Sequence, residues 1–138
     1  MVFFPVILRT WQFILERIKT MYINRNAVVI KAKQPFVDWV NATPKADEEK
    51  GHVFTLAEIN ADCEVLLIPD YDFLEESRGD ISPLKTDIFE DALDEWQTDE
   101  TYWPQNRDEK TFDQWFELEI HSMVDDTVEE PIIRDEQE

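Results

Sequence analysis

Three short apolar segments, separated by longer segments with helical periodicity, constrain the fold of this chain more than any other feature. They cover residues 27–32, 64–68 and 118–124, and they are rich in β-branched and other apolar side chains. Such a composition in a short run bounded by polar residues predicts β-strands. Residues 64–68 are the most uniformly apolar of the three, which predicts that this strand lies in the centre of the sheet.

Four segments between these strands carry the signals of α-helices. Pro35 indicates a helix start, because a proline at the first helical position loses no hydrogen bond. Thr55 and Glu58 have the spacing of a capping box, in which both side chains satisfy backbone N–H groups. A serine and a proline predict the start of the longest helix, over residues 82–97, and a fourth helix is expected over 109–116. The stripe of the longest helix that we expect to be buried comprises Leu84, Ile88, Phe89, Ala92, Leu93 and Trp96.

The order of these elements is β-α-α-β-α-α-β, which predicts an α+β fold with a small sheet of about three strands packed by helices. Helical crossovers between the strands permit parallel neighbours. Residues 21–125 are expected to form a single acidic domain, since a chain of 138 residues suffices for one hydrophobic core. An N-terminal amphipathic helix over residues 1–20 is expected to precede it, and an acidic flexible tail over residues 126–138 to follow it.

The N-terminal helix is predicted from apolar residues that recur at helical spacing. Arg9, Glu16 and Arg17 interrupt its apolar run, so no transmembrane segment is predicted. Such a helix can lie on a membrane surface or on a partner. Alternatively, Met21 is the natural start of the protein, and residues 1–20 are an upstream extension.

The charge of the chain is strongly negative and unevenly distributed. The net charge is −19, from 32 acidic and 13 basic residues. Residues 1–46 carry seven basic and two acidic side chains, or +5, whereas residues 47–138 carry six basic and thirty acidic ones, or −24. A body of this charge repels nucleic-acid phosphates and attracts basic protein surfaces. We therefore expect a basic protein partner and no direct binding of nucleic acid.

The cysteine and glycine contents exclude several kinds of site. Cys63 is the only cysteine, so the chain forms no internal disulfide, which fits a cytoplasmic protein. It adjoins the apolar strand at 64–68, where a buried and unreactive thiol is expected. Only two glycines are present, which argues against a glycine-rich phosphate loop, and no zinc-binding spacing or nucleophile elbow appears. No cofactor is predicted.

Carboxylates and one histidine are the candidates for a metal or catalytic site. Asp87, Asp91 and Asp94 are spaced by four and three residues, so they project from one side of a helix and could bind a divalent cation. A solvated acidic helix face is the favoured interpretation. Glu119 and His121 share one face of the last strand, where the carboxylate could orient the imidazole. A structural hydrogen bond is the favoured interpretation there.

Aromatic residues gather between positions 96 and 116. We expect most of them to pack the last two helices against each other and against the sheet. Tyr102 and Trp103 lie in a predicted loop rimmed by Asp99 and Glu100, so they are the candidates for an aromatic interaction site within a charged rim.

Four segments of the chain carry a resemblance to known sequences: residues 23–31 (INRNAVVIK), 33–39 (KQPFVDW), 67–69 (LIP) and 112–116 (FDQWF). They resemble small acidic bacterial proteins that are usually described as hypothetical. The resemblance covers about residues 22–125 and excludes the N-terminal helix, which agrees with Met21 as the natural start. It implies no activity and no site residues.

The leading functional hypothesis is a non-catalytic protein-interaction or regulatory domain, because the body is acidic and no catalytic constellation is recognisable. Two alternatives stay open. One is a divalent-metal-binding protein or metal-dependent hydrolase that uses the carboxylates or His121. The other is a nucleic-acid mimic that binds a basic protein through ordered carboxylates.

Overall fold

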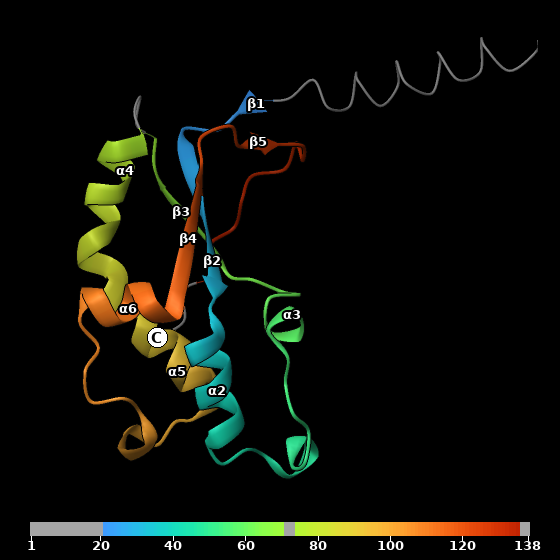
Figure 1. Ribbon diagram of the computed structural model, residues 1–138. Helices are drawn as coiled ribbons and strands as arrows, with labels where there is room; N and C mark the ends of the chain where they lie inside the picture. Colours follow the sequence, from blue (N-terminus) through green and yellow to red (C-terminus); the bar gives the residue numbers. More distant parts are fainter. Residues whose placement is uncertain (1–20, 71–73, 136–138) are drawn as a thin grey trace, which may run out of the picture. The chain divides into compact units, whose positions relative to one another are not determined.

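The computed structural model describes residues 21–70 and 74–135 (Figure 1). The predicted helix over residues 1–20 lies outside the described residues. The described chain forms two units, one of residues 25–122 and one that joins the residues before position 25 to those after position 122. In the described residues no helix is long and apolar enough to cross a membrane.

A three-stranded antiparallel sheet forms the framework of the unit 25–122. Its strands are β2 (Arg25–Ala32), β3 (Val65–Pro69) and β4 (Phe116–His121), in the order β3-β2-β4. Val28 of β2 lies opposite Leu66 of β3 and Ile120 of β4. The small sheet packed by helices is confirmed, whereas the parallel pairing that the crossovers would permit does not occur.

The central strand is β2, so the prediction that residues 64–68 lie in the centre is wrong. Every second residue of β2 is buried, beginning at Asn26. In β3 the side chain of Ile68 is buried, but Val65 and Leu67 are 53% and 49% exposed. Side chains of β3 therefore alternate between the core and solvent, and its uniform apolar character does not reflect burial on both faces.

Helices connect the strands and supply most of the remaining core (Figure 1). All four helices predicted between the strands are present, and the structure adds a further one, α4, between β3 and the longest helix. The helices of this unit are α2 (Gln34–Ala42), α3 (Leu56–Ile59), α4 (Leu74–Ile81), α5 (Lys85–Trp96) and α6 (Glu109–Trp115), with short 3-10 turns η1 (Asp47–Glu49), η2 (Ser82–Leu84) and η3 (Glu100–Tyr102).

The starts of the helices agree only in part with their sequence signals. The Thr55 hydroxyl oxygen accepts a hydrogen bond from the Glu58 N–H at 3.1 Å, as predicted, but the Glu58 carboxylate contacts the His52 imidazole at 2.7 Å. The serine and proline at 82–83 form η2, and α5 begins only at Lys85. Leu84 is 41% exposed, so its predicted place in the buried stripe of the longest helix is wrong.

Two apolar clusters hold the unit 25–122 together. The smaller one contains Val28, Ile68 and Ile81. The larger one joins β2, α2, α5, α6 and β4, and contains Ile30, Ala32, Phe36, Val40, Ile88, Phe89, Leu93, Phe112 and Phe116. The ring centroids of Phe89 and Phe112 are 6.1 Å apart, and those of Phe112 and Phe116 are 5.1 Å apart. The expected packing role of most of the aromatic residues is confirmed.

The other unit contains one two-stranded antiparallel pair. Met21 and Tyr22 form β1 (Met21–Tyr22), opposite β5 (Asp125–Asp126). The Ile23 N–H donates a hydrogen bond to the Val124 carbonyl oxygen at 3.0 Å. The last predicted strand, 118–124, is therefore too long, because β4 ends at His121.

Candidate functional site

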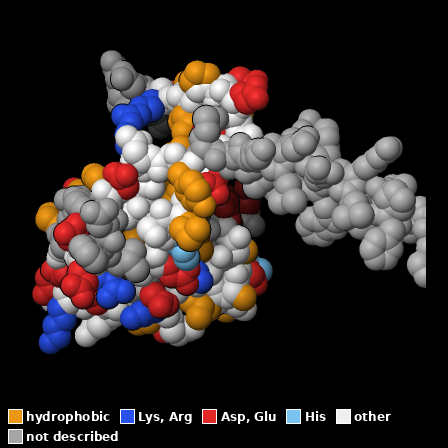
Figure 2. Space-filling model, turned by 90° about the horizontal axis from the view of Figure 1, so that it is seen from above, with side chains coloured by type: hydrophobic (Ala, Val, Ile, Leu, Met, Phe, Trp, Pro, Cys, Tyr) orange, Lys and Arg blue, Asp and Glu red, His pale blue; other side chains and the backbone are white. Residues whose placement is uncertain are grey.

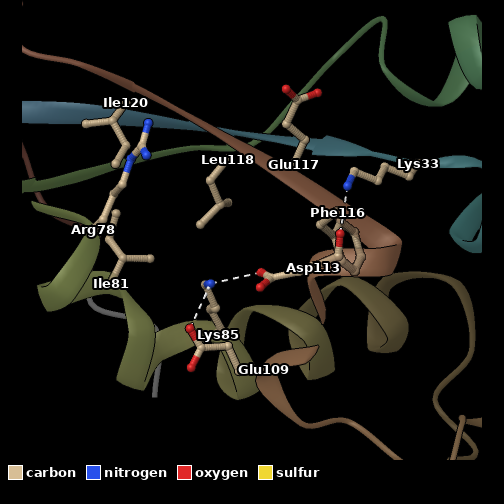
Figure 3. A pocket seen from close by; sticks show the side chains of 10 residues that line it. All are labelled: Lys33, Arg78, Ile81, Lys85, Glu109, Asp113, Phe116, Glu117, Leu118 and Ile120. Atoms are coloured by element: carbon tan, nitrogen blue, oxygen red, sulfur yellow. Dashed lines mark hydrogen bonds and ion pairs between the residues drawn. The ribbon is translucent and has the colours of Figure 1, made fainter. Parts of the chain in front are cut away.

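A hollow of about 320 Å³ in the unit 25–122 lies between α4, α5, α6 and β4 (Figure 3). We call it the α4–β4 pocket. Its apolar lining comes from Ile81, Phe116, Leu118 and Ile120. Its basic lining residues are Lys33, Arg78 and Lys85, and its acidic lining residues are Glu109, Asp113 and Glu117. Its volume lies in the range of small-molecule sites, and its lining combines four apolar with six charged side chains.

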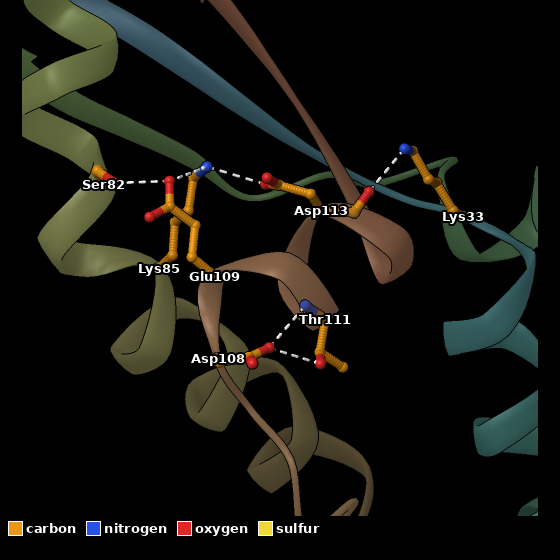
Figure 4. A network of polar contacts seen from close by, with 7 residues as sticks. All are labelled: Lys33, Ser82, Lys85, Asp108, Glu109, Thr111 and Asp113. Atoms are coloured by element: carbon orange, nitrogen blue, oxygen red, sulfur yellow. Dashed lines mark hydrogen bonds and ion pairs between the residues drawn. The ribbon is translucent and has the colours of Figure 1, made fainter.

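A chain of polar contacts forms one wall of the α4–β4 pocket (Figure 4). The Lys85 ammonium donates to Glu109 Oε1 at 3.0 Å and to Asp113 Oδ1 at 2.8 Å. The Ser82 hydroxyl donates to Glu109 Oε1 at 2.6 Å. At the other end, the Lys33 ammonium donates to the backbone carbonyl of Asp113 at 2.7 Å. These contacts join η2, α5 and α6 to the start of α2.

The protonation states in this wall are set by the same contacts. The hydrogen bond from Ser82, followed by the one from Lys85, lowers the pKa of Glu109 below its usual value. Burial alone lowers the pKa of Lys85, but the hydrogen bonds to Asp113 and Glu109 outweigh burial and raise it. Glu109 is therefore an anion and Lys85 a cation at neutral pH. Neither group is suited to proton transfer at that pH.

A second, smaller hollow of about 140 Å³ lies between β2, α3 and α5, and we call it the α3–α5 pocket. Its carboxylates are those of Asp62, Glu64 and Glu95. Its thiol is that of Cys63, and its apolar side chains are Ile30, Ala32, Phe36, Ile59, Ala92, Trp96 and Phe116. No lysine or arginine is among its lining residues in the described part of the chain.

The acidic side chains at the α3–α5 pocket repel one another. Burial, and then the negative charges of Glu64, Asp91 and Asp94, raise the pKa of Glu95 above its usual value. Asp91 and Asp94 are two of the three carboxylates that the sequence singled out as metal ligands. The negative charges of Asp91 and Asp94 therefore act on Glu95, which lines the α3–α5 pocket.

The predicted metal candidates do not converge on one point. Asp87, Asp91 and Asp94 are all exposed along α5. Among the described residues, no group of three or more His, Cys, Asp or Glu side chains is placed to hold a metal ion. On the face shown in Figure 2, acidic side chains lie in separate groups with basic ones between them.

Glu119 and His121 do lie together, on the face of β4 turned away from the helices. His121 Nε2 is 3.6 Å from Glu119 Oε2, but Glu119 Oε1 is only 2.7 Å from the Lys31 ammonium. The hydrogen bond between Lys31 and Glu119 lowers the pKa of Glu119. The same bond, together with the negative charge of Glu119, raises the pKa of Lys31. The main partner of Glu119 is therefore Lys31, which sequence reasoning missed. Lys31 and Glu119 belong to strands distant in sequence, so only the β2–β4 register could reveal their pairing.

The two candidate interaction aromatics differ in their surroundings. Trp103 is half-buried, and its indole N–H donates to the Gln97 carbonyl at 2.7 Å. The Arg107 guanidinium lies 5.6 Å from the centre of its ring. Tyr102 is 50% exposed. Trp103 therefore holds the loop to the core, and Tyr102 is the member of the pair that presents an aromatic ring to solvent.

The prediction of a buried Cys63 is wrong. Cys63 precedes β3 and is half-buried, with its thiol 3.3 Å from the carbonyl oxygen of Asn60. Asn60 anchors this turn, because its side chain pairs with both the N–H and the carbonyl of Ala32, at 2.8 and 3.0 Å. The thiol consequently lies at the α3–α5 pocket.

No protein-family model, curated protein or solved structure matches this chain. Sequence reasoning missed both pockets. The Lys85 contacts span 24 and 28 positions along the chain, so no local motif indicates them. The nearest sequence signal was the number of charged residues on α5 and α6.

Proposed function

We propose that this chain is a non-catalytic, cytoplasmic protein-interaction domain that binds a basic partner through the α3–α5 pocket. The observation that carries the proposal is that Asp62, Glu64 and Glu95 line an apolar hollow that has no basic residue in its lining within the described chain.

The size of the α3–α5 pocket favours one side chain over a whole small molecule. Its volume of about 140 Å³ is below the roughly 300 Å³ at which ligand pockets begin. An arginine or lysine side chain combines an apolar stem with a charged end. Its stem would contact Phe36, Trp96 and Ile59, and its cation would reach Glu64 and Glu95.

The electrostatics of the pocket favour such a cation. Burial, and then repulsion from neighbouring carboxylates, raises the pKa of Glu95, and a positive charge between Glu64 and Glu95 relieves that repulsion. Charge-assisted hydrogen bonds to a guanidinium add specificity, since it can bind a carboxylate through two parallel bonds. The charge of −24 over residues 47–138 would attract the basic partner from a distance.

The test uses a short arginine-rich peptide, titrated into the full chain by calorimetry. Glu64→Gln and Glu95→Gln are each expected to weaken binding roughly five- to ten-fold, because each removes one charged hydrogen bond. Asp87→Asn is the matched control, since it removes the same charge from the exposed side of α5 and is expected to change affinity less than about two-fold.

Binding at low salt that falls steeply toward 0.5 M salt is expected, because exposed charges are screened. Equal losses in the Glu95→Gln and Asp87→Asn variants would contradict the proposal, since binding would then depend on net charge alone. A peptide in which lysine and arginine are replaced by glutamine is expected not to bind.

A further inference from the structure

We infer that the α4–β4 pocket is a binding site for a small amphiphilic carboxylate, a molecule with an apolar chain and one anionic end. This site is separate from the α3–α5 pocket, and its ligand has the opposite charge. The argument rests on the volume, the apolar floor and the distribution of charge around the pocket.

The pocket concentrates basic residues in an acidic unit. Residues 25–122 carry nine basic and 24 acidic side chains, a net charge of −15. Three of those nine basic residues line the pocket, against three of the 24 acidic ones. The charges that line the α4–β4 pocket therefore balance, whereas the rest of the unit is strongly negative. An anion is consequently repelled less at this pocket than elsewhere on the surface of the unit.

Arg78 is the cation left to hold the anion. Lys85 is committed to Glu109 and Asp113, and the Lys33 ammonium to the backbone carbonyl of Asp113. Within the described residues, no ion pair involves the Arg78 guanidinium, which belongs to the exposed side of α4. A guanidinium matches the planar geometry of a carboxylate through two parallel hydrogen bonds. Among the described residues, Arg78 is the basic lining residue whose side chain has neither an ion pair nor a carbonyl acceptor, so its donors are the ones available to a carboxylate.

The apolar part of the ligand has a surface to lie on beside Arg78. In Figure 3 the side chains of Ile81, Leu118 and Ile120 lie next to Arg78, and Glu117 lies on the other side of Leu118. Leu118 and Ile120 are half-buried although they belong to the core face of β4. A ligand whose carboxylate binds Arg78 therefore keeps that carboxylate away from Glu117. Its apolar chain then lies over Ile81, Leu118 and Ile120, the apolar floor of the pocket.

The volume fixes the size of the ligand. With about 30 Å³ per water molecule in the liquid, 320 Å³ holds roughly ten non-hydrogen atoms. Octanoate has that size and combines an apolar chain with one carboxylate, so it is the probe of choice. Shorter carboxylates such as butanoate leave most of the floor uncovered and are expected to bind at least ten-fold more weakly.

The experiment titrates octanoate into the full chain at constant ionic strength and follows methyl NMR signals. Saturable shifts of the Ile81, Leu118 and Ile120 methyl groups are expected at millimolar concentrations or below. Arg78→Gln is expected to weaken binding about ten-fold, because it removes the charge and the two parallel donors but keeps a polar side chain. Lys50→Gln is the control, since Lys50 lies in the η1 region and does not line the pocket, and it is expected to bind as the unchanged protein does.

Octan-1-ol and octylamine complete the test. Both have the apolar chain without the anion, so both are expected to bind at least ten-fold more weakly than octanoate. Equal binding of octan-1-ol, full affinity in the Arg78→Gln variant, or shifts confined to methyl groups outside the pocket would each overturn the inference. Failure of the arginine-rich peptide to bind leaves this result unaffected, because the two pockets share only Phe116.

Discussion

Lys85 is the residue on which the wall of the α4–β4 pocket depends most. Its side chain is only 15% exposed, and it holds Glu109 and Asp113 together. Lys85→Met keeps the length and the apolar stem but removes the charge. We expect it to lower the free energy of unfolding by about 1–2 kcal/mol, since two carboxylates then face each other without a cation. Urea denaturation followed by tryptophan fluorescence measures this change.

Lys50→Met is the matched control for that substitution. Lys50 pairs with Asp47 at the surface, where the two side chains are 68% and 90% exposed. An exposed pair of this kind contributes little, so we expect a change within about 0.5 kcal/mol. Equal effects of the two substitutions would show that the Lys85 contacts add nothing beyond ordinary surface charge.

The residues of the pockets show the limit of what the sequence could predict. Periodicity identified Ile88, Phe89 and Leu93 as core, because burial on one side of a helix leaves a trace in neighbouring positions. The pairing of Lys31 with Glu119 leaves no such trace, since it depends on the register of two strands. Arg78 was not singled out either, because the pocket that it lines is formed by elements far apart in the sequence.

At the scale of elements, the local signals located helices and strands but not their arrangement. Proline and capping residues indicate where a helix can begin, whatever the helix packs against. The place of β3 at the edge follows instead from its packing partners, and its apolar sequence was equally compatible with the centre. The side chain of Asn60 completes the edge of β2 at Ala32, a contact with no sequence motif.

Helix α6 offers a test of capping, because it is short and starts at a well-defined residue. Asp108 accepts hydrogen bonds from the N–H and the hydroxyl of Thr111, at 2.8 and 2.7 Å. These bonds lower the pKa of Asp108. The contribution of this carboxylate to stability is therefore complete above its unfolded pKa of about 3.9 and is lost as the pH falls through the lower folded value.

Asp108→Ala is expected to lower Tm at pH 7 by roughly 3–6 °C, because an N-cap is lost. Asp108→Asn keeps a capping oxygen, so it should retain most of the Tm at pH 7 and lose less stability than the unchanged protein between pH 4 and pH 2. Asp94→Ala on the exposed side of α5 is the control. A similar loss in the Asp94→Ala variant would contradict a specific capping effect.

At the scale of the whole molecule, the core that the described residues form belongs to one unit. Both apolar clusters are built from side chains within residues 25–122, including all three strands of the larger sheet. From positions 21–24 and 123–135, the other unit contributes one strand pair of two residues on each side. Stability should therefore follow the unit 25–122, since buried apolar area is the main favourable contribution to folding.

A chain limited to residues 25–122 is expected to unfold cooperatively, with a Tm within about 5 °C of the full chain. Thermal unfolding followed by circular dichroism in the far and near ultraviolet measures this. A chain limited to residues 34–122 is the control, because it lacks β2 with Val28, Ile30 and Ala32 and should not unfold cooperatively. If the 25–122 chain instead loses its near-ultraviolet signal while keeping helix, the segments outside it complete the core, and the division of the molecule proposed here is wrong.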